Sequence, residues 1–187
     1  MDEHELAHLT PEQQIMLQVF GAHMNAEMVT QNVDDALATM TATPHVNHVP
    51  VLTGGAGSEA VRVFYANHLI GRFLPPDTQT FPVSRTIGAD QIVEESVAHF
   101  THSLPMDWML PGIAPTGKRV EIAIVAIIRF QDGKIAHEHI YWDQASVLVQ
   151  LGLIDPGNLP VAGAESARKV LDPTLPSNTL IKRGSRK

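Results

Sequence analysis

The sequence predicts an α+β fold in which helices come first along the chain and antiparallel strands follow. Apolar residues recur at helical spacing as far as Leu69, and from Thr78 onward they follow the period of strands. Two short connections, residues 88–90 and 131–134, separate β-rich runs in the manner of hairpin turns. With 187 residues, 44% of them hydrophobic and 18% charged, the chain is long enough for one domain with a packed core.

Helix-start signals account for the first part of the chain. A first helix is expected over residues 11–27, because Thr10 can cap it and Gln13 can complete a capping box. A second helix is expected over residues 32–40, and a third begins at Ser58. The residues expected to form the buried stripe of the first helix are Ile15, Met16, Val19 and Phe20.

The strands take up most of the remaining chain. A short strand is expected over residues 45–51, followed by a turn at Gly54, Gly55 and Gly57. These glycines indicate neither a P-loop nor a dinucleotide site, because no Gly-Lys-Ser/Thr follows them and no Rossmann context surrounds them. Further strands are expected over residues 78–87, 91–102, 119–130 and 135–142.

The Asp132-Gly133 turn predicts the register of the last hairpin. If Phe130 faces Ile135, regular pairing places a polar row opposite an apolar wall on one face. The residues of that face would be His137, His139, Tyr141 and Asp143, opposite Ile128, Ala126, Ile124 and Ile122. The other face would carry Ala123, Val125, Ile127, Ile140 and Trp142. Because one domain has few helices to cover both apolar faces, we expect a homodimer formed through the sheet.

Composition excludes several classes of protein. The chain has no cysteine, so disulfides, thiolate nucleophiles and cysteine-based metal sites are ruled out. A formal charge of −7 argues against a nucleic-acid partner, since the basic cluster of Lys182, Arg183, Arg186 and Lys187 is confined to the C-terminal end. There is no membrane-spanning apolar run, and residues 1–5 are acidic where a secretory signal would be basic. We therefore expect a cytoplasmic protein.

The chain changes character after Leu153, where proline and glycine become frequent. This divides it into a domain over residues 1–152 and a C-terminal extension over residues 153–187, with a short helix at residues 165–171. The extension is expected to pack on the domain or on a partner subunit.

Asp143 is the first candidate for chemistry. An aspartate at the inner end of an apolar strand loses hydration, which would raise its pKa toward that of a general base. Asp143 also directly precedes the helical stretch 145–151, which Gly152 would end, so it can equally serve as an N-cap. The two roles are compatible, and both remain open.

Other candidates share this face or the loops near it. His139 and Tyr141 lie on the Asp143 face, and His102 ends an earlier strand that also carries Glu94. A histidine beside a carboxylate can orient it, relay a proton or donate to an oxyanion, although each histidine alone can simply be a core residue. Candidate ligand contacts in the first strand and in the covering loop are His48, Asp107 and Trp108. We expect no metal site, because paired histidines at strand spacing are a weak signal.

The chain resembles the SnoaL-like polyketide cyclases of the nuclear-transport-factor-like superfold from about Gln13 to Gly152. Thr101-His102 is similar to that family's Thr-His strand end, and residues 112–118 are similar to its Gly-x-x-Pro-Thr-Gly-basic loop. Residues 132–135 resemble its hairpin, and Asp143 stands nine residues before Gly152, as the family's catalytic aspartate does. Two features depart from the family: His139 replaces a common tryptophan, and the tail is longer.

The resemblance implies a cone-shaped, strongly curved antiparallel sheet whose pocket is closed by N-terminal helices. It also implies cofactor-free acid–base catalysis in which Asp143 is the base and His102 is a histidine of the pocket. From the residues themselves we add His139 as a catalytic partner, and as candidate substrate contacts Tyr141, His48, Asp107, Trp108 and Glu94. The expected substrate is a small hydrophobic carbonyl compound that is cyclised or isomerised. Two alternatives stay open, because the superfold hosts many activities: a lactone or epoxide hydrolase in which Asp143 activates water, and a binding module without turnover.

Overall fold

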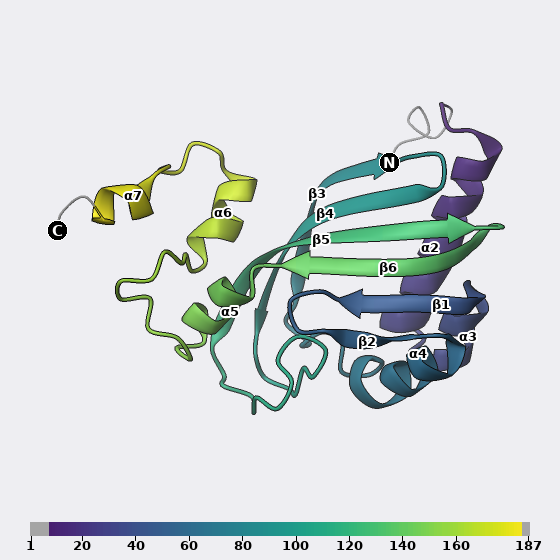
Figure 1. Ribbon diagram of the computed structural model, residues 1–187, viewed down its shortest axis with the longest axis horizontal. Coiled ribbons are helices and arrows are strands. Elements are labelled where there is room, and N and C mark those ends of the chain that lie inside the picture. The colour runs from purple at the N-terminus through teal and green to yellow at the C-terminus, as the bar shows by residue number, and fades with distance from the viewer. Residues whose placement is uncertain (1–7, 185–187) are drawn as a thin grey trace.

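The computed structural model describes residues 8–184 and has one six-stranded curved sheet with helices against it (Figure 1). The acidic residues 1–5 and the last two residues of the basic cluster lie outside the described residues. The strand order is β2-β1-β6-β5-β4-β3, and β1 and β6 are the one parallel pair in that sheet. The α+β prediction is confirmed, with a sheet that is curved but not closed into a barrel. None of the described helices is long and apolar enough to cross a membrane.

The N-terminal helices lie together and cover one face of the sheet (Figure 1). The helices are α2 (Pro11–Met28), α3 (Val33–Ala38), α4 (Ser58–Phe64) and the π-helical turn η1 (Tyr65–Leu69). The predicted capping box is present, since the Gln13 N–H donates to Thr10 Oγ1 at 3.3 Å and the Thr10 N–H donates to Gln13 Oε1 at 3.0 Å. The predicted stripe is partly wrong, because Ile15 is 47% exposed.

The strands run close to their predicted positions, with two differences at the start of the sheet. The strands are β1 (Met40–His48), β2 (Thr53–Ala56), β3 (Gln79–Ile87), β4 (Gln91–Thr101), β5 (Arg119–Gln131) and β6 (Lys134–Trp142). The first strand begins earlier than expected, because three alternate threonines from Thr39 to Thr43 favour extended backbone over helix. Gly54 and Gly55, which were expected to form only a turn, lie in strand β2, where a Cβ on Gly54 would collide with the Val46 carbonyl.

The predicted register of the last hairpin is wrong beyond its first pair. Phe130 does face Ile135, but the next pair is Arg129 with His137, so Ala136 is an extra residue in β6. This β-bulge shifts every later pair by one position and exchanges the two faces of the strand. The inner face of β6 therefore carries Glu138, Ile140 and Trp142, and the outer face carries His137, His139 and Tyr141.

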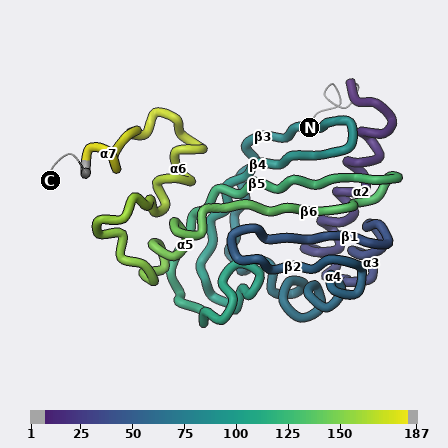
Figure 2. Tube along the Cα trace, viewed as in Figure 1, coloured from purple at the N-terminus to yellow at the C-terminus, as the bar shows by residue number. Residues whose placement is uncertain are grey.

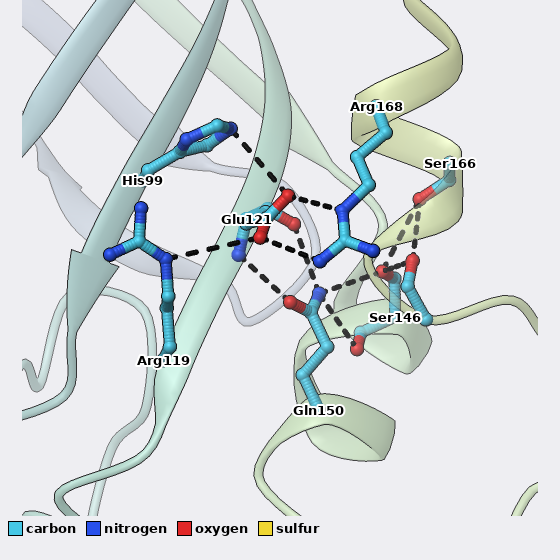
Figure 3. A network of polar contacts seen from close by, with 8 residues as sticks. His99, Arg119, Glu121, Ser146, Gln150, Ser166 and Arg168 are labelled. Carbon is cyan, nitrogen blue, oxygen red and sulfur yellow. Dashed lines mark hydrogen bonds and ion pairs between the residues drawn. The ribbon is translucent and has the colours of Figure 1, made fainter.

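The C-terminal extension starts beside the sheet and ends away from it, as the chain trace shows (Figure 2). It follows α5 (Gln144–Gln150) and contains α6 (Glu165–Leu171) and α7 (Thr179–Gly184). Helix α6 packs against β5 and β4, where Arg168 binds both carboxylate oxygens of Glu121 at 2.7 and 2.8 Å (Figure 3). Ser146 of α5 adds a hydrogen bond to the Gly163 carbonyl at 2.7 Å. The first part of the extension is thus fastened to the domain by side-chain contacts.

Candidate functional site

A cavity of about 260 Å³ lies between the inner face of the sheet and helix α2. Most of its wall is apolar, and this part is formed by Phe20, Met24, Met28, Phe73, Leu74, Pro82, Ala98, Trp108, Ile124, Ala126, Ile128 and Ile140. The polar residues of the wall are Glu27, His48, Thr80, Arg85, Glu94, Ser96 and Glu138. A largely apolar pocket with a few converging polar groups is typical of a small-molecule site.

Glu138 is the carboxylate that the β6 bulge turns toward this cavity, and it is 7% exposed. The Tyr65 hydroxyl donates to Glu138 Oε2 at 3.1 Å, and His23 Nε2 lies 3.4 Å from the same oxygen. Burial by itself raises the pKa of Glu138, but the facing His23 and the Tyr65 hydrogen bond outweigh it and hold that pKa below its ordinary value. Glu138 is therefore an ionised carboxylate in an apolar wall.

His23 and Glu27 stand one turn apart on the inner side of α2. His23 Nε2 lies 3.1 Å from Glu27 Oε1, and His23 Nδ1 lies 2.7 Å from Thr39 Oγ1. The Thr39 hydroxyl donates its own proton to the Ala36 carbonyl at 2.6 Å, so His23 Nδ1 is the donor in that pair. Burial lowers the pKa of His23, yet the carboxylates of Glu138 and Glu27 raise it further, to well above its ordinary value.

His48 lies in the cavity wall inside a shell of aromatic rings. Its ring centroid is 5.5 Å from Phe64, 5.1 Å from Trp108 and 6.0 Å from Trp142. This burial lowers the pKa of His48 to about 4, so the imidazole is neutral at pH 7. Its Nδ1 lies 3.3 Å from the Thr53 carbonyl, which can only accept, so Nδ1 carries the proton and Nε2 keeps its lone pair.

A second pair of charges in the wall joins two strands. Arg85 of β3 donates to both carboxylate oxygens of Glu94 on β4, at 2.6 and 2.7 Å. The guanidinium also lies 6.0 Å from the centroid of the Phe20 ring on α2. This pair gives the cavity a polar side that is already neutralised.

The structure brings three of the predicted site residues into the cavity wall, namely His48, Trp108 and Glu94. Trp108 is positioned by its indole N–H, which donates to the Phe73 carbonyl at 2.8 Å. Asp107, its neighbour, instead pairs with His68 at 3.3 Å at the surface.

The predicted group around Asp143 does not line this cavity. Asp143 is exposed at the N-terminus of α5, where Oδ1 accepts from the Ser146 N–H at 3.1 Å, so the N-cap role is confirmed and the expected inward orientation is wrong. His139 and Tyr141 lie on the outer face because of the bulge, and Tyr141 is 40% exposed. His102 is fully buried at the end of β4, where Nδ1 accepts from the Thr116 N–H at 3.3 Å. The catalytic roles of these residues stay predictions.

Sequence reasoning missed His23, Glu27, Tyr65 and Glu138. A signal for the first two was present, since they continue the buried stripe of α2 at helical spacing after Met16 and Phe20. Polar residues on an otherwise buried stripe need partners, which is a reason to look for a site there. Glu138 was hidden by the one-residue change in register.

Comparisons with known proteins can be set beside this geometry. The sequence profile of a family described as SnoaL-like polyketide cyclase matches residues 22–151. A proposed SnoaL-like polyketide cyclase from Jannaschia sp. CCS1 has a similar structure, with a TM-score of 0.62 at 17% identity over 79% of this chain and 98% of that one. None of the curated proteins matches the sequence.

Two further solved structures are similar. AclR of Streptomyces galilaeus, a proposed hydroxylase, has a TM-score of 0.55 at 18% identity over 76% of this chain and 99% of that one. TerC, which was co-crystallised with polyporic acid, has a TM-score of 0.52 at 12% identity over 74% of this chain and 98% of that one. At these identities the likeness shows the fold alone.

Proposed function

This chain belongs to the SnoaL-like polyketide cyclase family, and on that premise we propose that it is an acid–base enzyme for a small hydrophobic carbonyl compound held in the inner cavity. The observation that carries the proposal is the position of Glu138, a carboxylate almost out of reach of water in an apolar wall. A proton next to a carbonyl is removed most efficiently by a base that is fixed in place and shielded from solvent.

Glu138 replaces Asp143 as the proposed base because of where the two carboxylates stand. Both described contacts of Glu138 use Oε2, so Oε1 takes the proton from the bound compound. Asp143 is exposed and uses Oδ1 to cap α5. His48 lies in the same wall as Glu138, within the space that a small ligand would fill.

Solvent deuterium exchange tests this proposal. Wild type is incubated with a panel of β-dicarbonyl and ketone compounds in D₂O, and carbon-bound deuterium is followed by NMR. Glu138→Gln should slow the exchange by more than about 100-fold, in line with general-base contributions. The matched control is Glu95→Gln. Glu95 follows Glu94 in β4 but does not line the cavity, so this variant should leave the exchange unchanged.

The Asp143→Asn variant decides between the two carboxylates. Asparagine also caps helices well, so this variant keeps the fold. If Asp143→Asn abolishes exchange and Glu138→Gln does not, the base is Asp143 and our assignment fails. Ligand binding that is tight in all variants, with no exchange in wild type, would instead identify a binding module.

One observation favours hydrolysis as the second candidate. Because the Thr53 carbonyl holds the proton of His48 on Nδ1, the Nε2 lone pair is available to activate a water molecule inside the cavity. A lactone or epoxide would then be opened with incorporation of solvent oxygen. Mass spectrometry of products formed in H₂¹⁸O separates this reaction from cyclisation or isomerisation.

We also propose that the outer face of the sheet pairs with a second copy of the chain. The bulge leaves Tyr141 on this face, beside Val125 and Ile127 of β5. Phe81 on β3 adds a further apolar side chain that is 37% exposed. Sedimentation at micromolar concentration should give a dimer, and a monomer alone would contradict this arrangement.

A further inference from the structure

Three buried side chains place their ligand atoms around one point at the cavity wall. His23 Nε2 is 3.1 Å from Glu27 Oε1 and 3.4 Å from Glu138 Oε2, and the ligand atoms of all three residues lie within 4.8 Å of one another. The three residues are 0%, 5% and 7% exposed. They come from α2 and β6, two elements that the fold itself brings together.

We propose that His23, Glu27 and Glu138 bind one divalent transition-metal ion with the ligand preference and size of Zn²⁺. One imidazole and two carboxylates are ligands that zinc accepts, whereas Mg²⁺ prefers oxygen ligands alone. Zinc–ligand bonds of roughly 2.0–2.1 Å in a tetrahedron separate neighbouring ligand atoms by roughly 3.3 Å. The two separations measured from His23 Nε2, 3.1 and 3.4 Å, lie on either side of that value.

The surroundings of His23 and Glu138 are those expected of metal ligands. A metal-binding histidine usually donates its other ring N–H to a fixed acceptor, which orients the ring. His23 Nδ1 does so to Thr39 Oγ1 at 2.7 Å, and Thr39 is itself fixed by its bond to the Ala36 carbonyl. Tyr65 orients Glu138 in the same way by donating to Oε2 at 3.1 Å. The side chains are thus held in place before any ion binds.

The charge of the group also favours a cation. Glu27 and Glu138 place two carboxylate side chains in one buried cluster, and only one imidazole faces them. Buried carboxylates need partners of opposite charge, and a divalent ion bound by two carboxylates and one imidazole has no net charge.

The ion would be reached from the cavity, because Glu27 and Glu138 also line its wall. Three protein ligands leave the fourth position of a tetrahedral ion open, as in catalytic zinc sites. An oxygen atom of the bound compound would fill that position, which selects carbonyl or enolate oxygens. This last step rests on the proposed function, whereas binding of the ion does not.

Calorimetry with ZnCl₂ on the full-length chain, freed of metal with a chelator, tests the site. We expect one ion per chain. His23→Gln and Glu27→Gln should each weaken binding by about 100-fold or more, and Thr39→Val by about 10-fold, because it removes only the partner that orients His23. The matched control is His139→Gln, which removes an imidazole from the outer face, where His139 contacts His45 and stacks on His137.

Two results would overturn the inference: no saturable binding to wild type, or binding that His139→Gln abolishes and His23→Gln leaves intact. Should His23→Gln fail to fold, X-ray absorption of Co²⁺-loaded wild type still decides the matter. One imidazole with oxygen ligands is expected, and two or more imidazoles would place the ion on the surface histidines. Deuterium exchange that persists in chelator, with no metal bound, would show that the ion takes no part in the exchange reaction. The acid–base proposal would then stand without it.

Discussion

The two faces of strand β6 carry the same kinds of side chain in opposite settings. On the inner face Glu138 meets His23 and Tyr65, all of them buried, and both of these partners contact its Oε2. On the outer face His137 stacks on His139 with centroids 4.3 Å apart. Burial lowers the pKa of both outer histidines, and the positive charge that neighbouring histidines would carry lowers it further.

This difference shows that residue type says little about a site until the face is known. The polar row expected from alternation exists, but it lies on the outer face of the sheet, away from the cavity. There His139 contacts other histidines, His45 and His137. The inner face has a single carboxylate on β6, and its partners come from α2 and η1. A group that can do chemistry arises where separate elements supply opposite charges to one buried point.

The largest expected difference between the faces is in stability. Glu138→Ala removes one of the two carboxylate partners of the buried His23 and the acceptor of the Tyr65 hydroxyl, and it should lower the free energy of unfolding by about 3 kcal/mol. His139→Ala on the outer face should change it by about 0.5 kcal/mol or less. Urea denaturation followed by circular dichroism measures both. Equal effects would mean that the contacts of Glu138 on the inner face add no more stability than those of His139 on the outer face.

Self-association is the next test of the outer face. Ile127→Lys places a charge in the centre of the proposed contact and should weaken the dimer by about 30-fold or more, since a buried unpaired charge is costly. Ile127 pairs with His139 and is only half-buried in the isolated chain, so the monomer should fold normally. Sedimentation equilibrium at several concentrations gives the dissociation constant. An unchanged constant would move the contact elsewhere.

The role of Asp143 is tested by two substitutions of different size. Asp143→Ala removes the oxygen that accepts from the Ser146 N–H and should destabilise the protein by about 1 kcal/mol. Asp143→Asn should cost only a few tenths of that amount, because asparagine caps equally well. Thermal denaturation of the two variants distinguishes a cap from a buried carboxylate, for which both changes would be costly.

Glu121 is the outer-face counterpart of Glu138, and its effect depends on pH. Hydrogen bonds from Arg168 lower the pKa of Glu121, so this contact stabilises the fold above the ordinary glutamate pKa and is lost as pH falls through the lowered value. Arg168→Gln should cost about 0.5–1 kcal/mol at pH 7, and the cost should shrink as the pH falls below the ordinary range of a glutamate. Urea denaturation of both proteins across this range provides the measurement, and a difference independent of pH would exclude the ion pair as its source.

Much of the fold could be predicted because its signals are local. The Thr10 cap, the Asp132-Gly133 turn and the helix at residues 165–171 each depend on neighbours in sequence, and the structure has all three. The bulge at Ala136 could not be predicted this way. Nothing in its own residues marks it, and β6 is also paired with β1, which shifts register at the same place.

The candidate site was predictable only in part, for the same reason. His48, Trp108 and Glu94 were selected from their strands and loop, and they do line the cavity. The cluster around Glu138 depends on long-range pairing, because α2, η1 and β6 supply its members. Their spacing along the chain does not predict that these residues contact one another, so the cluster can be recognised only in the three-dimensional structure.

The parallel pairing of β1 with β6 also bears on how the chain folds. More than half of the domain lies between these two strands, so closing this pair costs more chain entropy than forming the β5–β6 hairpin. The β3–β4 hairpin can form during synthesis, whereas the β1–β6 contact must wait until β6 has left the ribosome. Because Glu138 reaches His23 only after that contact forms, substitutions at Glu138 should speed unfolding and leave the folding rate almost unchanged.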